Sequence, residues 1–279
     1  MLPLMLPLML ACVLNDLSQP STVDRTRILA VRATPAEAQP GDTVRLRALA
    51  VDPDVGIQSL IWFGCLLEDS SDFGCDEPQL IGVVAPGGGI PTFDVPADLL
   101  DGLSEEERLE GMNYLVQIQA VPNGVDLEAI AAGEVEGAEL ATLGESGYKR
   151  VPVSLAPTPN DNPAIEHVLG EAGIVLEKND TLVLSPGQTY ELEAVLADDA
   201  VQAYTFRNSD GEDEERVEEP YISLYATVGT FDQFWKLHPH LNFEYTAPED
   251  PASETGTLWI VVRDRRGGMG WLELNLSFR

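Results

Sequence analysis

Hydrophobic and polar residues alternate along two stretches of the chain that resemble each other. "PGDTVRLRALAVD" begins at Pro40 and "PGQTYELEAVLAD" begins at Pro186, and the two share Pro, Gly, Thr, Leu, Ala and Asp at equivalent places. In the first stretch, positions 44, 46, 48 and 50 are apolar, and Arg45 and Arg47 lie between them. This period of two is typical of a strand buried on one face. The duplication predicts two domains of the same β architecture.

A second pair of segments extends the repeat. "GMNYLVQIQAV" and "GTLWIVVRD" each place an aromatic residue, Tyr114 or Trp259, three positions after a glycine. Trp62 and Tyr225 supply a large aromatic residue for a strand in between. Short strands, frequent turn signals and a central aromatic residue are typical of a Greek-key sandwich. The predicted fold class is therefore all-β, with two tandem β-sandwich domains.

Longer segments resemble bacterial Ig-like domains. "YISLYATVGTFD", "FEYTAPEDP" and "GTLWIVVRDRRGGMGWLELNLSF" follow one another as the later strands of such domains do, and "ILAVRATPAEAQPGDTVRLRALAVDPD" is similar to their opening strands. The resemblance covers the chain from about residue 26 to its end. It implies tandem Ig-like modules of the kind found in bacterial envelope lipoproteins. It says more about fold than about function, because sandwiches support many unrelated roles.

The domain boundary is expected in "APTPNDNPAIEHV", where prolines and polar residues interrupt the strands. This places the first Ig-like domain at residues 26–157, a linker at 158–163 and the second domain at 164–279. The first domain carries two insertions. In one, Ser104 and Glu107 have capping-box spacing, which predicts a short helix beginning at Ser104. The other, residues 126–147, is rich in Ala and Glu and falls between the last two strands.

The apolar start of the chain, "MLPLMLPLMLACVLNDLS", indicates export. Its uncharged stretch is too short to span a membrane as a helix, which needs about 20 apolar residues. Leu-Ala followed by Cys12 resembles the lipobox of bacterial lipoproteins, although the usual basic start of a signal is missing. The resemblance implies a signal segment at 1–11, a lipidated Cys12 and a tether at 12–25, on a protein anchored in the bacterial cell envelope. A disordered apolar tail with a stray cysteine is the alternative.

The net charge limits the classes of binding partner, and the cysteines suggest a disulfide. The chain has 16 basic and 47 acidic residues, a formal net charge of −31. This excludes nucleic-acid binding through a basic surface and electrostatic docking on anionic lipid. The membrane is then reached through the lipid alone, and the expected partner is an envelope protein or a glycan. In an exported protein, Cys65 and Cys75 are expected to form a disulfide.

Calcium is the one cofactor that the sequence suggests. "PNDNP" resembles the calcium-binding linker of cadherins, and it supplies oxygen ligands from Asn160, Asp161 and Asn162. In an Ig-like topology, Asp198 and Asp199 follow the second strand of the second domain and are expected near this linker. The alternative is a polar, proline-rich linker whose Asp and Asn side chains cap turns.

A histidine pair offers the only hint of catalysis. His238, His240 and Glu244 have the H-x-H-x3-E spacing of the metal-binding strand of cupins. The flanking glycines and the second motif of cupins are missing, and Pro239 indicates an edge strand or a loop. The sequence has no Gly-x-Ser-x-Gly nucleophile motif and no glycine-rich phosphate loop. A metal-dependent enzyme is therefore an alternative to the favoured prediction, which is a non-enzymatic protein.

Aromatic residues indicate where a partner could bind. "FDQFWKLHPHLNF" is dense in aromatic residues, and Trp235 is expected to be partly exposed and to contact a protein partner. If the chain leaves the membrane at the first domain, this stretch should lie at the far end of the second. The sequence thus predicts a spacer or protein-binding module. A carbohydrate or cell-surface adhesion module with a calcium-rigidified domain junction is the alternative, in which Trp235 or Trp271 could stack on sugar.

Overall fold

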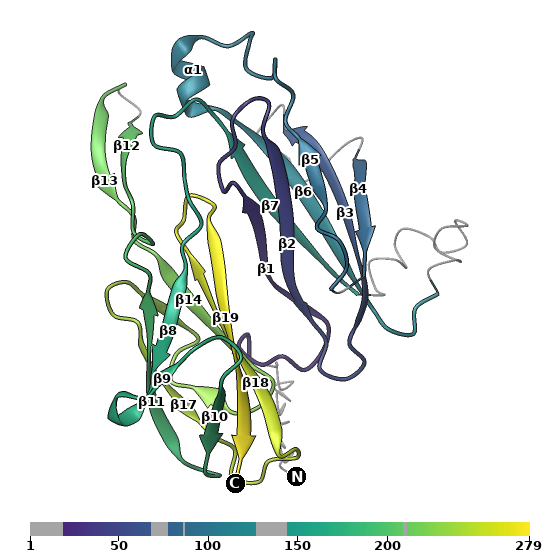
Figure 1. The fold of residues 1–279 in the computed structure, drawn as a ribbon, viewed down its shortest axis with the longest axis vertical. Coiled ribbons are helices and arrows are strands. Elements are labelled where there is room, and N and C mark those ends of the chain that lie inside the picture. The colour runs from purple at the N-terminus through teal and green to yellow at the C-terminus, as the bar shows by residue number, and fades with distance from the viewer. Residues whose placement is uncertain (1–18, 68–77, 86, 127–143, 209–210) are drawn as a thin grey trace, which may run out of the picture.

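The computed structural model describes residues 19–67, 78–85, 87–126, 144–208 and 211–279, and strands dominate it (Figure 1). The first sandwich contains β1 (Arg27–Thr34), β2 (Thr43–Val51), β3 (Ile57–Leu67), β4 (Gln79–Val84), β5 (Thr92–Asp94), α1 (Glu105–Glu110), β6 (Met112–Pro122) and β7 (Glu145–Val153). One sheet has the order β1-β2-β5 and the other β4-β3-β6-β7. The chain thus alternates between two antiparallel sheets, as in an Ig-like sandwich.

The alternation along β2 is confirmed for its first half. Val44 and Leu46 are fully buried between the two sheets, together with Trp62 of β3, and Arg45 and Arg47 are exposed. Beyond Arg47 the outer face of the strand becomes apolar, because Leu49 there is buried against the second domain. One face of β2 therefore changes from basic to apolar along its length.

The predicted short helix is confirmed. Ser104 is the N-cap of α1, and its side chain accepts a hydrogen bond from the Glu107 amide. The Glu107 carboxylate in turn accepts from the Ser104 amide at 2.8 Å. These bonds satisfy two donors that a helix start otherwise leaves unpaired.

The second sandwich begins after the linker. It contains β8 (Ile165–Leu169), η1 (Glu171–Gly173), β9 (Val175–Leu176), β10 (Thr181–Leu184), β11 (Thr189–Leu196), β14 (Tyr221–Ala226), β15 (Thr230–Phe231), β16 (Trp235–Leu237), β17 (Asn242–Thr246), β18 (Thr255–Arg263) and β19 (Met269–Phe278). Its sheets have the orders β10-β19-β18-β14-β16 and β15-β17-β11-β8-β9. A separate hairpin, β12 (Ala203–Arg207) and β13 (Asp213–Val217), projects from this domain toward the level of α1 (Figure 1).

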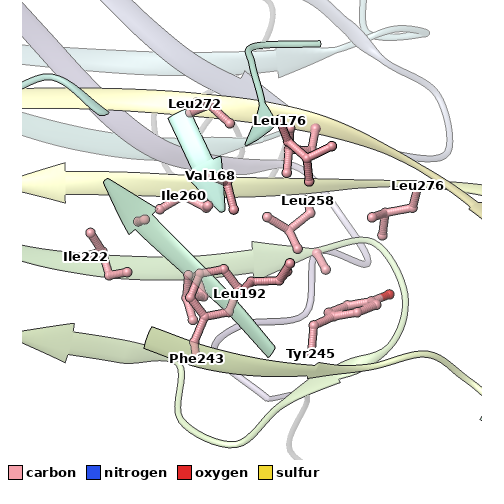
Figure 2. Close-up of a cluster of buried hydrophobic side chains, with 14 of the residues drawn as sticks. Val168, Leu176, Leu192, Ile222, Phe243, Tyr245, Leu258, Ile260, Leu272 and Leu276 are labelled. Carbon is pink, nitrogen blue, oxygen red and sulfur yellow. The ribbon is translucent and has the colours of Figure 1, made fainter. Parts of the chain in front are cut away.

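The core of the second sandwich lies between these two sheets (Figure 2). Leu258, Ile260 and Leu272 extend from one sheet toward Phe243 and Tyr245 of the other. Tyr245 is buried, but its hydroxyl donates to the Val228 carbonyl at 2.7 Å, so the phenol has a partner. Burial at this density is the main stabilising contribution to such a domain.

The two domains use their aromatic residues differently, which the repeat did not predict. Trp62 lies in the core of the first sandwich. Tyr114 packs against the same core. The expected counterparts of these two residues in the second domain, Tyr225 for Trp62 and Trp259 for Tyr114, lie on the outside of their sheet and pack toward the first domain. The backbone repeat is therefore preserved, but the aromatic residues of the second copy serve a domain interface.

The chain enters the described structure on the second domain. Thr22 forms a parallel bridge with Ala226, at the end of β14. The Ala226 amide donates to the Ser21 carbonyl, and the Val23 amide donates to the Ala226 carbonyl, each at 2.9 Å. This part of the predicted tether is thus docked onto the second sandwich. Among the described residues, no helix is long and apolar enough to cross a membrane.

Candidate functional site at the domain junction

An apolar cluster joins the two sandwiches side by side. Leu29, Ala30 and Leu49 of β1 and β2 pack against Trp259 and Val261 of β18. Val23, from the segment before β1, is buried in the same cluster. These side chains are at most 8% exposed. Burial of this kind opposes the free rotation that is the default for domains joined by a linker.

The β18–β19 turn forms the polar half of the junction. The Asp264 Oδ1 atom accepts hydrogen bonds from the amides of Arg266, Gly267 and Gly268, at 2.8, 2.9 and 2.9 Å. Gly268 lies so close to the turn and the linker that an added Cβ would lie 2.0 Å from Asp264 Oδ2 and 2.6 Å from the Asp161 carbonyl oxygen. The second glycine of "DRRGG" therefore lets the turn approach the linker.

Arg266 connects the two domains through buried carboxylates. Its guanidinium donates to Glu218 of the second domain at 2.9 Å and to Glu37 of the first at 3.3 Å. It also donates to the Thr158 carbonyl of the linker and stacks on the Tyr204 ring, 4.3 Å from the ring centroid. The Glu218 side chain is 2% exposed, so this pair is shielded from water. Away from water, each buried charge is stabilised mainly by its partner, so the loss of one partner leaves the other charge uncompensated.

The linker asparagines are part of the same cluster. Asn160, which is 1% exposed, donates from its side chain to Asp264 Oδ2 at 2.9 Å, and its amide donates to Glu37 at 2.7 Å. The side chain of Asn162 donates to the Ala33 carbonyl and accepts from the Met269 amide. Each asparagine thus forms hydrogen bonds to both domains.

Burial changes two pKa values at the junction. Lys149 of β7 is 3% exposed and donates to the Gly267 carbonyl. Loss of hydration lowers the pKa of Lys149 to about 8, although the Asp264 carboxylate opposes this shift. Burial also raises the pKa of Glu218 above its usual value, against the effect of its hydrogen bonds from Gln202 and Arg266. The cluster therefore contains a lysine and a glutamate whose charged forms are destabilised by burial.

The residues predicted to bind calcium surround this cluster but are used in other ways. Both side-chain polar atoms of Asn162 form hydrogen bonds within the protein. Asp161 forms two hydrogen bonds with Gln202. Asp198 and Asp199 follow Ala197, whose amide bonds the Ala164 carbonyl, so they lie near the linker with exposed side chains. Within the described residues, no group of three or more acidic, His or Cys side chains could hold a metal ion. Calcium at the junction stays a prediction.

The histidine pair lies in a turn. His238 and His240 flank Pro239 directly after β16, which is the edge strand of its sheet. Their amides are held by the carbonyls of Pro220 and Leu237, both at 2.9 Å. Glu244 is exposed on β17, opposite Glu191. The proline thus indicated the local structure correctly, and the strand geometry that would align two imidazoles does not occur.

Trp235 is exposed, as the sequence predicted. Trp235 and Phe234 are each 47% exposed, at the start of β16. Trp235 pairs with Ser223, three residues before the Ala226 that holds the N-terminal segment. The stretch therefore lies near the chain entry, on the side of the second domain. The expectation that this stretch lies far from a membrane anchor stays a prediction, because Cys12 lies outside the described residues.

Two of the three cysteines lie outside the described residues. These are Cys12 and Cys75. Cys65 lies on β3, opposite Leu115 of β6. Lipidation of Cys12 and the Cys65–Cys75 disulfide stay predictions.

A cleft of about 650 Å³ opens beside the junction, between α1 and the β12–β13 hairpin. Arg207 of the hairpin closes one side through an ion pair with Glu106 of α1 at 3.1 Å, and it also pairs with Asp213 at 2.7 Å. The arginines of this cleft are thus neutralised by neighbouring carboxylates. No local pattern in the sequence indicated this contact or the role of Arg266, because the partners lie far apart along the chain.

Comparisons with known proteins find likeness in solved structures only. No family model and no curated protein matches the chain. The D00-D0 domain of Intimin is 8% identical, with 91% of this chain and 98% of that one covered and a TM-score of 0.26. The Ig1-2 module of the Drosophila receptor tyrosine phosphatase DLAR is 11% identical, with 91% and 99% covered and a TM-score of 0.27.

A third similar structure is a nucleoside hydrolase-related hypothetical protein from Saccharophagus degradans. It is 10% identical with a TM-score of 0.28, and the likeness covers 43% of this chain and 26% of that protein. The first two of these structures are tandem or paired domains over almost the whole chain. At these scores the likeness is too low to add to what the strand order shows: two Ig-like β-sandwiches.

Proposed function

We propose that the chain is a lipid-anchored, non-enzymatic protein of the bacterial cell envelope that acts as a two-domain binding module. The observation that carries the proposal is the junction itself. An apolar cluster and a buried ion network join the sandwiches, and both oppose independent movement of the two domains. A rigid pair of domains offers a binding surface with little conformational entropy to lose.

The position of the chain entry supports an anchor close to the second domain. The predicted lipid site, Cys12, precedes Gln19, the first described residue, by seven positions. Seven residues extend at most about 25 Å. Since residues 21–23 are docked on β14, a lipidated Cys12 would hold the second sandwich near the membrane surface. This arrangement favours a partner that lies in or beside the membrane over a distant one.

Trp235 and Phe234 form the candidate contact for such a partner. Exposed tryptophans are enriched among residues that dominate binding energy in protein interfaces. Trp235 begins an edge strand and Phe234 directly precedes it, so the loss of either exposed ring should leave the core packing intact. The proposed partner is an envelope protein.

Two variants test the proposal in the native envelope, with the natural signal segment in place. Cys12→Ser should release the protein from the detergent phase into the aqueous phase, because stable attachment needs the acyl chains. Trp235→Ala should reduce recovery of a cross-linked partner and leave the melting temperature nearly unchanged. Tyr245→Ala, in the core, is the matched control for an aromatic residue whose loss unfolds the second domain.

Each result has a contrary outcome. Equal membrane attachment of the Cys12→Ser protein would remove the lipid anchor from the proposal. Unfolding of the Trp235→Ala protein would show that this ring is structural. Turnover of a substrate that depends on His238 and His240 would replace the binding module with an enzyme.

A further inference from the structure

Three arginines gather on the outer face of β1 and β2. Arg32 of β1 lies directly opposite Arg47 of β2, and Arg45 lies opposite Thr34, two pairs further along the same ladder and on the same face. Like charges directly opposite each other across an antiparallel pair are destabilising. The chain has only 16 basic residues against 47 acidic ones, so carboxylates are available to neutralise a basic pair. Arg32 and Arg47 nevertheless face each other as like charges, and this sets the group apart.

Within the part of the chain that the structure describes, these three arginines have no ion pair and no side-chain hydrogen bond. All nine ion pairs between described side chains involve other basic residues. The Nε atom of Arg32 is buried and has no partner. A buried donor without an acceptor is uncommon in folded proteins, and a missing ligand is one explanation for it. Burial and the neighbouring Arg47 also lower the pKa of Arg32.

The arginines line a pocket that continues into a second one. The first, of about 220 Å³, is lined by Arg32, Thr34, Arg45, Arg47 and Ile90. The second, of about 350 Å³, shares Arg47 and Ile90 with it and lies at the open edge of the first sandwich. Trp271 of the second domain lines this second pocket. Trp62 lines it too, and its buried Nε1 donor has no hydrogen-bond partner among the described residues.

We propose that this double pocket, named here the arginine groove, binds an anionic saccharide, with Arg32, Arg45 and Arg47 on its carboxylate or sulfate group and Trp271 against its ring. Guanidinium groups bind oxyanions through paired hydrogen bonds, and an anion would also remove the repulsion between Arg32 and Arg47. An indole offers a flat apolar surface to a sugar ring. The inference rests on the proposed function, since it names a ligand class for that binding module.

The position of the groove favours a saccharide over an acidic peptide. An extended peptide commonly binds by adding main-chain hydrogen bonds to a free sheet edge. Arg45 lies on β2, the middle strand of its sheet, where it is paired with Thr34 on one side and Thr92 on the other. Around Arg45, recognition therefore depends on side chains, and a free edge of β2 is confined to the stretch from Arg47 on, beyond its last pair with β5. The volumes of the two pockets are suited to a short oligosaccharide rather than to a chain of many residues.

Calorimetry with the full chain tests the proposal. The probes are a trisaccharide of uronic acid, the neutral trisaccharide of the same linkage, inorganic sulfate and a short oligoglutamate. The acidic trisaccharide should bind, and Arg32→Gln or Arg47→Gln should each weaken it about tenfold or more, because each removes charged hydrogen bonds. Arg216→Gln is the matched control, since Arg216 is already paired with Glu214 and stacked on Phe206. That variant should bind the trisaccharide as the wild type does.

The probes separate the possible occupants. Equal binding of the neutral and acidic trisaccharides would overturn the role of the arginines. Sulfate as tight as the acidic trisaccharide would reduce the groove to a simple oxyanion site, and tighter binding of oligoglutamate would replace the saccharide with an acidic peptide. No binding of any probe would reject the groove as a site. These outcomes are independent of the lipid anchor and of Trp235, so they leave the tests of the proposed function intact.

Discussion

Two groups of arginines in this protein have opposite surroundings. Arg266 is enclosed by Glu37 and Glu218, and both carboxylates form ion pairs with it. Arg32 and Arg47 lie opposite each other, and neither forms an ion pair with a carboxylate among the described residues. Both groups adjoin the domain interface, so position alone does not explain the difference. A charge that the fold needs is matched by the fold, and a charge left unmatched is available to a ligand.

The largest expected effect comes from removing Arg266. Arg266→Met leaves Glu37 and Glu218 buried without their cation, and breaking a buried pair from one side costs about 3–5 kcal/mol. The free energy of unfolding, measured with urea at neutral pH, should fall by that amount. The loss should shrink in acid, because protonation removes the two uncompensated charges.

Arg265 provides the control for Arg266 in the same turn. Its contact with Glu219 is 3.5 Å long, and both side chains are more than half exposed. Arg265→Met should therefore change the free energy of unfolding by at most about 1 kcal/mol. Equal losses from the two variants would mean that the turn itself, and not the buried charge, holds the junction.

Lys149 predicts a stability change with pH. Its pKa is about 8 in the folded protein, below its ordinary value of 10.5, so between these values the unfolded state binds more protons. Stability must then rise with pH across this window, by up to about 3 kcal/mol. Urea denaturation at intervals from pH 7.5 to pH 10 should show the rise, and Lys149→Met should flatten it.

The rise in stability that Lys149 causes ends near pH 10. Burial raises the pKa of Tyr245, so the folded state keeps that proton longer than the unfolded state and stability falls at higher pH. Lys178→Met is the control, because Lys178 is exposed. A rise with pH that persists in the Lys149→Met protein would assign it to other groups.

Much of the fold was readable from the sequence because its signals are local. The alternation at Val44 and Leu46 predicted a strand, and the Ser104 and Glu107 spacing predicted a helix start; both were confirmed. Backbone pattern and capping depend on residues a few positions apart. The duplicated strand therefore indicated two sandwiches before any contact between them was known.

The junction could not be read in the same way. A tryptophan in a strand is buried equally well by its own core or by a neighbouring domain, so Trp259 carries no sequence signal for its interface. The carboxylates around Arg266 lie 229 and 48 positions away from it in the chain. The oxygen atoms of the linker asparagines are visible in the sequence, but their hydrogen bonds to the β18–β19 turn depend on the placement of strands far apart in the chain.

The smallest expected effect concerns the stability of the arginine groove without ligand. Arg47→Thr removes the like charge opposite Arg32 and should raise the free energy of unfolding by about 0.2–1 kcal/mol. Arg45→Thr is the matched control on the same strand and face, because Arg45 lies opposite Thr34 and has no such repulsion to relieve. It should change stability by less than about 0.5 kcal/mol.

Added salt provides a second test of the repulsion between Arg32 and Arg47. At 1 M salt the screening length falls to about 3 Å, so the wild type should gain more stability from added salt than the Arg47→Thr protein does. Chemical denaturation at low and high salt measures both gains. A clear loss of stability in Arg47→Thr would show that Arg47 has a structural partner, and the contrast with Arg266 would then fail. A gain confined to this variant would mean that the fold keeps the Arg32–Arg47 pair at a cost, as a site built for an anion would.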